Sequence, residues 1–414
     1  MHFVRIFSSC FFLFILISCA KRKESARFSP GEIARVEADS PVDLHPYADE
    51  MVKYDLSRAF KSQRPYNLPD ILKCVRYVPL ETGAECLVPE IRQCIMTDKY
   101  VYLDSGSEFD RVLIFDRDGR FVGSINSGRG PGEIVKLNNI SYDEKAHELM
   151  ILFSSSFISF YTETGAYKRT DKLPFSPDSF SVLDSSFVFY LNHTAANHHI
   201  PNLNNRRVLV TDRDYHIRYL NLPYNLSEKL HLGCSFPEIS RNGEEIQLSF
   251  ALTDTIYSYS SGAVKIRCCF DLGDEGIPRK RLQHFDDAEF FRFTARNDVF
   301  FYWGGYQESP GHRFVKYMKK GLGYQYFIDK RTGNITGGPV QESSSLPSVG
   351  MPVGVYGSSF IGLSDADDVV ERINAIHAGA GYDHSLLVDS DLALLESVKP
   401  GDNPVLSIYE LKEF

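Results

Sequence analysis

The stretch that decides the fold is residues 100–125, which read YVYLDSGSEFDRVLIFDRDGRFVGSI. It holds three runs rich in apolar and aromatic residues, at 100–104, 111–115 and 121–125. The last two runs are joined by Asp116–Gly119, in which the Asp accepts a backbone hydrogen bond and the Gly supplies the positive φ of a tight hairpin. The stretch therefore predicts three antiparallel strands joined by short turns.

The same pattern of apolar runs and turns recurs along the chain. Similar runs and turns occur within 148–173, 187–220, 245–270 and 299–335, and two more runs follow at 359–363 and 404–411. One such meander cannot cover both of its faces, so it must stack on its neighbours, which is the physical logic of a β-propeller. The length allows about 51 residues for each of six blades or about 44 for each of seven, against a usual repeat of about 40 to 50. The copies located favour an all-β, six-bladed β-propeller.

Two further segments bear on how the ring is built. Residues 367–398 carry a helix-like spacing of apolar residues, so we expect a small helical insertion in the last blade. Ring closure requires the two chain ends to share a blade, because an unpaired end leaves an open sheet edge. We expect Val52–Leu56 to pair beside 404–411 in the last blade, which places the propeller at residues 51–414.

The N-terminus has the pattern of an export signal. Residues 6–17 form an almost unbroken apolar run, which suits a signal peptide and falls short of the ~20 residues needed to span a bilayer. The run ends at Leu16-Ile17-Ser18-Cys19, which resembles the lipobox of bacterial lipoproteins, where the Cys19 sulfur receives the diacylglycerol. We expect a lipoprotein signal peptide at 1–18; an ordinary secretory signal is the alternative. Residues 19–50 are polar and contain prolines, and they predict a tether.

Composition and charge exclude several classes of protein. Hydrophobic residues make up 43% and charged residues 24% of the 414 residues, which is typical of a globular chain. The formal net charge is −9, so the chain lacks the basic character that nucleic-acid binding normally requires. No later apolar run is long enough to span a membrane, so we expect membrane attachment through the lipid anchor at Cys19.

Three phrases carry a family resemblance. Val78–Thr82, Gly128–Glu133 and Asp402–Tyr409 are similar to the opening blade and the final strand of the six-bladed β-propeller lipoproteins of the bacterial envelope. The first copy, within residues 101–121, resembles the NHL-type propeller repeat. The resemblance implies the fold and an outer-membrane lipoprotein, and it implies no particular chemistry. The basic run Ala20–Lys23 after the anchor favours the periplasmic face over the cell surface.

One candidate ligand-binding segment is Gly128–Glu133. It is rich in glycine but lacks the helix and the Lys-Ser/Thr ending of a phosphate-binding loop, so we interpret it as an inter-blade turn with a type II geometry at Pro131-Gly132. Arg129 and Glu133 are candidates to face the channel mouth. The alternative is that they form a salt bridge or a hydrogen bond that defines the turn.

A second candidate segment precedes the last strands of the fifth blade. Trp303, Tyr306 and Arg313 fall in what the sequence indicates is an insertion between strands. Exposed aromatic rings with an Arg would stack on a sugar ring or bind a carboxylate. The alternative is that the rings only pack the loop.

Two functions from different classes remain open. The first is a non-catalytic binding or scaffold module for a protein or glycan partner, with no cofactor. The second is a propeller hydrolase or lyase, such as a metal-assisted lactonase, with its site at the channel mouth. The second requires three or more Asp, Glu or His side chains from different blades to converge within metal-binding distance. No motif indicates such a set, so the sequence favours binding and assigns no catalytic or metal-ligating residue.

Overall fold

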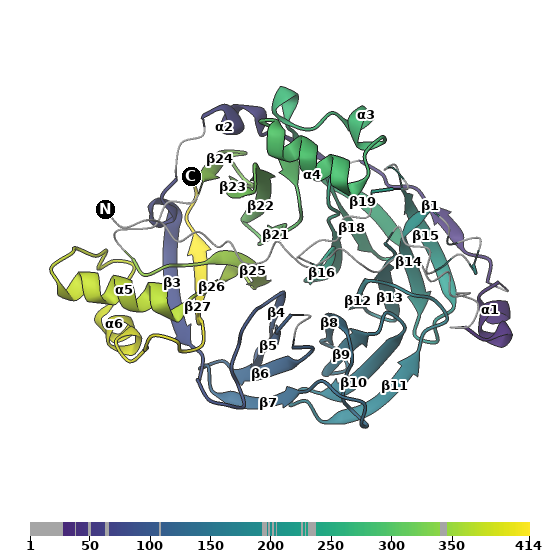
Figure 1. The fold of residues 1–414 in the computed structure, drawn as a ribbon, viewed down its shortest axis with the longest axis horizontal. Coiled ribbons are helices and arrows are strands. Elements are labelled where there is room, and N and C mark those ends of the chain that lie inside the picture. Colours follow the sequence, from purple (N-terminus) through teal and green to yellow (C-terminus); the bar gives the residue numbers. More distant parts are fainter. Residues whose placement is uncertain are drawn as a thin grey trace.

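The computed structural model describes residues 28–414 apart from 38, 49–50, 63–65, 107–108, 193–196, 198, 201–202, 204, 225–226, 228, 231–236 and 340–345. The expected signal peptide and Cys19 therefore lie outside the described residues. The described chain forms six sheets arranged around one axis (Figure 1). The six-bladed β-propeller expected from the repeated turns is confirmed.

The first three blades are antiparallel meanders whose strands follow one another from the axis outward. Blade 1 consists of β4 (Gln93–Met96), β5 (Tyr100–Asp104), β6 (Val112–Asp116) and β7 (Phe121–Ile125). Blade 2 consists of β8 (Leu137–Asp143), β9 (Glu148–Phe153), β10 (Phe157–Thr162) and β11 (Tyr167–Lys172). Blade 3 consists of β12 (Ser179–Leu183), β13 (Ser186–Tyr190), β14 (Arg206–Asp212) and β15 (Ile217–Pro223).

The other three blades follow the same plan with small departures. Blade 4 consists of β16 (Ile239–Asn242), β17 (Glu245–Leu248), β18 (Thr255–Ser260) and β19 (Ala263–Asp271). In blade 5 the innermost position is shared by β20 (Phe301–Tyr302) and β21 (Gln307–Glu308), followed by β22 (His312–Lys319), β23 (Leu322–Asp329) and β24 (Ile335–Pro339). Blade 6 consists of β25 (Met351–Tyr356), β26 (Ser359–Ser364), β27 (Val405–Leu411) and β3 (Leu72–Pro79).

The repeated sequence pattern corresponds to the outer three strands of a blade. It covers β5 to β7 in blade 1 and β9 to β11 in blade 2, and the innermost strands β4 and β8 precede it. Those inner strands border the channel and mix polar with apolar residues, so they lack the apolar runs that mark the outer strands. In blade 5, the expected insertion is wrong, because residues 307–308 and 312–319 are strands β21 and β22.

Blade 6 closes the ring with strands from distant parts of the chain. β27 pairs with β26 on one side and with β3 on the other, in a register that places Val405 opposite Pro79 and Tyr409 opposite Val75. The expected closure by Val52–Leu56 is wrong. That segment contains β2 (Val52–Asp55), which pairs in parallel with β19 and becomes a fifth strand of blade 4. The closing strand is instead the last one before blade 1 in the sequence.

Residues 28–56 form an arm along the outer edge of the propeller. α1 (Pro30–Glu37) is followed by β1 (Val42–Leu44), which pairs in parallel with β15 as a fifth strand of blade 3. β2 extends blade 4 in the same way. The side chain of Phe28 is only 3% exposed. The tether expected for residues 19–50 is therefore wrong from Phe28 onward, because buried Phe28, an ion pair of α1 and the pairing of β1 fasten this part of the chain to the propeller.

Besides α1, helices of the described chain occupy three more places on the outside of the propeller. α2 (Ser57–Ser62) and the 3₁₀ turn η2 (Leu68–Ile71) lead from the arm to β3, while α3 (Arg279–Leu282) and α4 (Asp287–Arg296) connect blades 4 and 5. α5 (Ala366–His377) and α6 (Asp389–Leu395) lie between β26 and β27, which confirms the helical insertion in the last blade (Figure 1). Among the helices of the described chain, none is long and apolar enough to cross a membrane.

In blades 1 and 2, the turn between the outer two strands packs on the blade before it. A Cβ on Gly119, in the β6–β7 turn, would lie 2.2 Å from the carbonyl oxygen of Pro79 in blade 6. A Cβ on Gly165, in the β10–β11 turn, would lie 2.9 Å from the Ile114 side chain in blade 1. Their φ angles are 82° and 86°, so both positions require glycine for conformation and for space. These turns set the spacing between blades.

Removal of β3 should abolish cooperative folding, whereas removal of the first part of the arm should only lower stability. A chain that starts at Met51 keeps every blade and loses α1 and β1. A chain that starts at Leu80 leaves β27 as an exposed edge and removes buried residues from blade 6. Thermal unfolding followed by circular dichroism should show a cooperative transition at reduced temperature for the first chain and none for the second. Cooperative unfolding of the chain that starts at Leu80 would contradict this account of closure.

Candidate functional site

The innermost strands of all six blades surround a cavity of about 620 Å³ on the propeller axis. β4, β8, β12, β16, β21 and β25 each contribute residues to its wall, and Figure 1 shows these strands around the centre of the ring. The β4–β5, β8–β9, β16–β17 and β25–β26 turns also line it, so the cavity opens at the end of the channel where these turns lie. The volume falls within the roughly 300 to 1,000 Å³ of small-molecule sites.

The wall has an apolar arc and a polar arc. The apolar arc comes from blades 6 and 1 and presents the half-buried side chains of Ile95, Val353, Val355 and Tyr356. The polar arc comes from blades 4 and 5 and presents half-buried Ser240, Arg241, Asn242 and Gln307. A ligand held between them would meet methyl groups and a ring on one side and hydroxyl, amide and guanidinium groups on the other.

The ionisable groups at the rim of the cavity are already paired. Lys99 lies 3.0 Å from Glu163, which also accepts a hydrogen bond of 2.7 Å from the Tyr142 hydroxyl. These contacts, the Tyr142 hydrogen bond first, hold the pKa of Glu163 below its ordinary value. Arg241 pairs with Glu144 at 2.9 Å. The rim pairs therefore join blade 1 to blade 2 and blade 2 to blade 4, and they leave little uncompensated charge.

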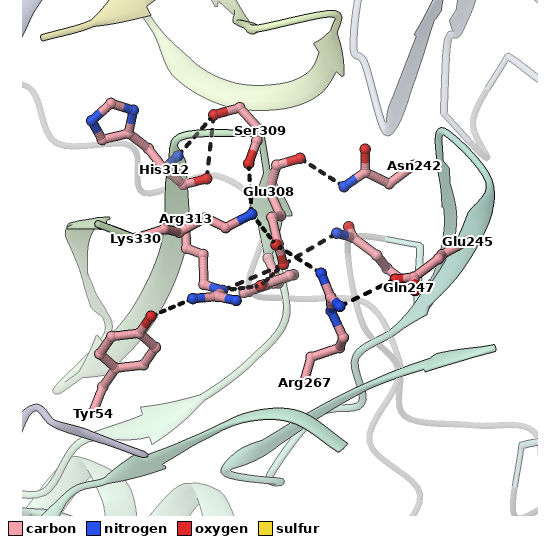
Figure 2. Close-up of polar contacts among 11 residues, drawn as sticks. Tyr54, Asn242, Glu245, Gln247, Arg267, Glu308, Ser309, His312, Arg313 and Lys330 are labelled. Carbon is pink, nitrogen blue, oxygen red and sulfur yellow. Dashed lines mark hydrogen bonds and ion pairs between the residues drawn. The ribbon is translucent and has the colours of Figure 1, made fainter. Parts of the chain in front are cut away.

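Glu308 is the centre of a buried polar cluster in the cavity wall (Figure 2). Its carboxylate accepts hydrogen bonds from Lys330 at 2.6 Å and from the Tyr306 hydroxyl at 2.5 Å. Arg313 Nε and Arg267 Nη2 each lie 3.4 Å from a carboxylate oxygen of Glu308. Glu308 is 1% exposed, so three cations surround one carboxylate that is almost sealed from water.

The cations keep this buried carboxyl group charged. Burial raises the pKa of Glu308, but Arg313 and Lys330 outweigh that effect and bring the pKa below its ordinary value. Arg267 has a second carboxylate partner, Glu245, at 3.6 Å. At neutral pH the charges of the cluster are therefore constant, and the carboxylates largely balance the cations.

The same cluster joins three parts of the chain. The Asn242 side chain of β16 donates a hydrogen bond of 2.9 Å to the Glu308 carbonyl oxygen, which links blade 4 to blade 5. Arg313 donates to the hydroxyl of Tyr54, a residue of β2 in the arm. Figure 2 shows Tyr54 and Asn242 on opposite sides of Glu308. The position of the cavity wall thus depends on the arm as well as on the blades.

Two of the residues singled out in the sequence belong to this cluster. Tyr306 and Arg313 are 4% and 5% exposed, and Arg313 Nε lies 3.1 Å from the Tyr306 hydroxyl. Their expected setting, an exposed loop, is wrong because β21 and β22 enclose them. Trp303 lies elsewhere, half-buried, with its ring 6.0 Å from that of Phe290 and 5.8 Å from that of Phe291 in α4.

Arg129 and Glu133 lie in the connection between blades 1 and 2. The turn at Pro131-Gly132 is closed by a hydrogen bond from the Glu133 N–H to the Gly130 carbonyl at 3.0 Å, and the φ of Gly132 is 81°. The Glu133 carboxylate accepts a 2.7 Å hydrogen bond from the Gly130 N–H. The inter-blade turn is confirmed, and Glu133 stabilises it. Neither Arg129 nor Glu133 is among the cavity-lining residues.

The convergence of ligands that a metal-assisted hydrolase requires is not found within the described ranges, where no three His, Cys, Asp or Glu side chains are placed to hold a metal ion. The residue that sequence reasoning missed is Glu308. It lies in a two-residue strand between glycine-rich turns, and its partners Lys330 and Arg267 are brought to it only by the pairing of strands across two blades. No local pattern marks it.

Replacement of Glu308 by Gln should lower the free energy of unfolding by about 3 to 5 kcal/mol, because it leaves buried cations without their carboxylate. The matched control is Glu413→Gln, which removes an exposed partner of Arg331, with both side chains 66% exposed. That change should cost at most about 1 kcal/mol. Urea unfolding of the two variants measures the difference, and equal effects would show that the Glu308 cluster is not a buried ion network.

The same cluster predicts acid sensitivity with a defined sign. Because the pKa of Glu308 in the fold lies below its ordinary value of 4.5, the stabilisation is present above pH 4.5 and is lost as the pH falls through the lowered pKa. The difference in unfolding free energy between the wild-type chain and Glu308→Gln should therefore shrink below about pH 4.5. A difference that stays constant down to pH 3 would contradict the assignment.

One solved structure shares the fold. No curated protein matches the chain. A protein named as exported, from Bacteroides fragilis NCTC 9343, superposes with a TM-score of 0.72 at 18% identity over 88% of this chain and 100% of that one. BamB from Moraxella catarrhalis gives a TM-score of 0.36 at 11% identity, over 71% of this chain and 73% of its own.

A family model matches residues 51–410, a span that runs from β2 to the penultimate residue of the last strand. The matched region therefore contains all six blades, the closing strand and every residue of the cavity wall. The chain belongs to the family described as "Domain of unknown function (DUF4934)".

Proposed function

We propose that this chain is an exported, lipid-anchored binding protein that takes a neutral, hydroxyl-rich ligand, such as a segment of a glycan, into its central cavity. The observation that carries the proposal is the cavity of about 620 Å³ with its apolar arc beside a polar arc. A sugar ring has C–H faces and a rim of hydroxyl groups, so it complements both arcs at once. Pockets that combine apolar walls with a few placed polar groups are the usual form of ligand sites.

The charges around the cavity favour a neutral ligand over a charged one. Glu163, Glu144 and Glu308 each have a cationic partner within 3.0 Å, and Asp98 accepts a 2.6 Å hydrogen bond from the Tyr356 hydroxyl. A charged ligand would have to break such pairs and pay for their desolvation. Hydroxyl groups can instead add hydrogen bonds to the amides of Asn242 and Gln307 without displacing an ion pair.

The proposed location rests on the N-terminal sequence. Leu16–Cys19 has the lipobox pattern, and acyl chains on Cys19 would anchor the mature protein stably when two or more are attached. The protein from Bacteroides fragilis that shares the fold is itself named as exported. We place the propeller at the outer membrane, on the periplasmic face, because Ala20–Lys23 is basic. A binding module at that place would meet envelope or imported glycans.

Replacement of Val355 by Asp should abolish glycan binding. The half-buried Val355 belongs to the apolar arc, and a carboxylate there would repel the C–H face of a sugar and demand water. The control is Val122→Asp on β7 of blade 1, where the side chain is 38% exposed and away from the cavity lining. Neutral oligosaccharides on an array, followed by calorimetry, should bind the wild-type chain and Val122→Asp. No binding to the wild-type chain, or equal binding by Val355→Asp, would exclude the cavity.

Replacement of Cys19 by Ala should remove lipid attachment and move the protein from the membrane fraction to the soluble fraction. Metabolic labelling with a fatty-acid analogue should mark the wild-type chain and leave Cys19→Ala unlabelled. Cys10→Ala is the matched control, because Cys10 lies within the apolar run and should leave labelling unchanged. Unchanged membrane partitioning of Cys19→Ala, or labelling lost equally in both variants, would contradict the lipoprotein assignment.

A further inference from the structure

Arg207 is a buried cation without an anionic partner among the described residues. It lies in β14 of blade 3 and is 5% exposed. Its Nε is enclosed and has no hydrogen-bond partner, and no described carboxylate forms an ion pair with its guanidinium. Nε is the only nitrogen of this side chain that is both enclosed and unpartnered, so the two terminal nitrogens retain some contact with solvent. The edge of the guanidinium formed by the terminal nitrogens therefore keeps a small exposed area.

Aromatic rings enclose the guanidinium. Its central carbon lies 4.5 Å from the ring centroid of Tyr224 and 5.2 Å from that of Phe250 in blade 4. The Tyr190 ring stacks on Phe250 at 5.2 Å, which extends the aromatic wall. Rings fix the plane of a guanidinium and leave its edge free for a ligand. The arrangement is a flat, oriented cation at the boundary between blades 3 and 4.

Neither of the neighbouring acids forms an ion pair with Arg207. Burial raises the pKa of Glu238 to about 8, so that carboxyl group is mainly protonated at neutral pH, and it accepts a 3.2 Å hydrogen bond from the Ser179 hydroxyl. Burial also raises the pKa of Asp178, to about 6, and Asp178 makes no ion pair with Arg207. Among the described residues, neither carboxyl group is in ion-pair contact with Arg207, although Asp178 is mainly ionised at neutral pH.

Comparison with Arg313 shows why the situation is unusual. Both arginines are 5% exposed, and an Arg side chain stays charged in a protein. Arg313 lies 3.4 Å from Glu308, whereas the partners that the structure describes for the Arg207 guanidinium are aromatic rings, which offset only part of the cost of burying a charge. Buried charges in proteins are normally paired. The missing partner points to a ligand that supplies the anion.

We propose that Arg207 is the anchor of a second binding site, which takes the carboxylate group of a small organic acid against the Tyr224 and Phe250 rings. A carboxylate matches the guanidinium edge with two parallel hydrogen bonds, and apolar atoms beside it would contact the rings. Arg207 is not among the residues of the central cavity. β14 also begins at the end of the blade opposite the turns that line that cavity, because β12 and β14 run parallel and β13 between them is antiparallel to both.

Calorimetry on the full chain tests the site with pairs of probes that differ only in charge. Benzoate with benzamide and acetate with acetamide represent free acids, and a short peptide with a free C-terminus and its amide represents a chain end. We expect benzoate to bind and benzamide not to bind. Arg207→Met should weaken benzoate binding at least about tenfold. Binding of the peptide acid in preference to benzoate, or of sulfate in preference to both, would overturn the small-acid assignment.

Thermal stability without ligand separates a binding role from a structural one. Arg207→Met should leave the melting temperature unchanged or raise it, because it removes an unpaired buried charge. Arg313→Met is the matched control and should lower it, because it leaves Glu308 with one cation fewer. Val355→Asp should keep benzoate binding, so failure of the glycan proposal is distinguishable from failure of this one. Failure of every carboxylate probe to bind, benzoate binding retained in Arg207→Met, or equal destabilisation of the two Arg variants would overturn the proposal.

Discussion

The pairing of β3 with β27 is the constraint on which the rest of the structure depends. Alternate residues of β3 enter two different cores: Val75 and Tyr77 pack in the cluster that joins blade 6 to blade 5, and Val78 packs in the cluster that joins blade 6 to blade 1. One strand therefore seals both seams of the last blade. Without it the six inner strands would not be held in a circle, and the cavity they enclose would have no fixed wall.

The outer strands and the propeller could be predicted because the residues of their turns are a local signal. The turns at Asp116–Gly119 and Gly165 carry residues that only tight hairpins require, so the outer strands and the propeller could be recognised. β1 was missed and β2, expected as a strand, was assigned to the wrong blade, because parallel pairing with residues more than a hundred positions away leaves no local pattern. β22 was hidden by the glycines and the proline around it, which predict a loop.

The candidate site also combines residues that a local pattern indicates with residues that only distant strand pairing brings together. Tyr306 and Arg313 were recognised by residue type, since aromatic rings with an Arg suggest binding, but their burial depends on strands that the sequence does not mark. Glu308 decides the role of Arg313, because an Arg beside a buried carboxylate forms a structural ion pair. Arg207 has aromatic neighbours instead, and we propose that it binds a ligand. The role of each charged side chain is decided by the residue it contacts on another strand. That residue lies far away in the sequence, so no single segment reveals it.

The arm connects the proposed anchor to this arrangement. Its described part begins at Phe28, whose ring stacks on that of His199 at 4.2 Å, and α1 is fastened to blade 2 by the pair of Glu32 with Lys172 at 2.8 Å. With acyl chains at Cys19, the residues up to Phe28 can span at most about 30 Å even when fully extended. A long flexible tether would let the propeller sample every orientation above a membrane. With the proposed anchor in place, the fastened arm would instead limit how far blades 2 and 3 can move away from the lipid surface, and the contact of Tyr54 with Arg313 would extend that constraint to the wall of the cavity.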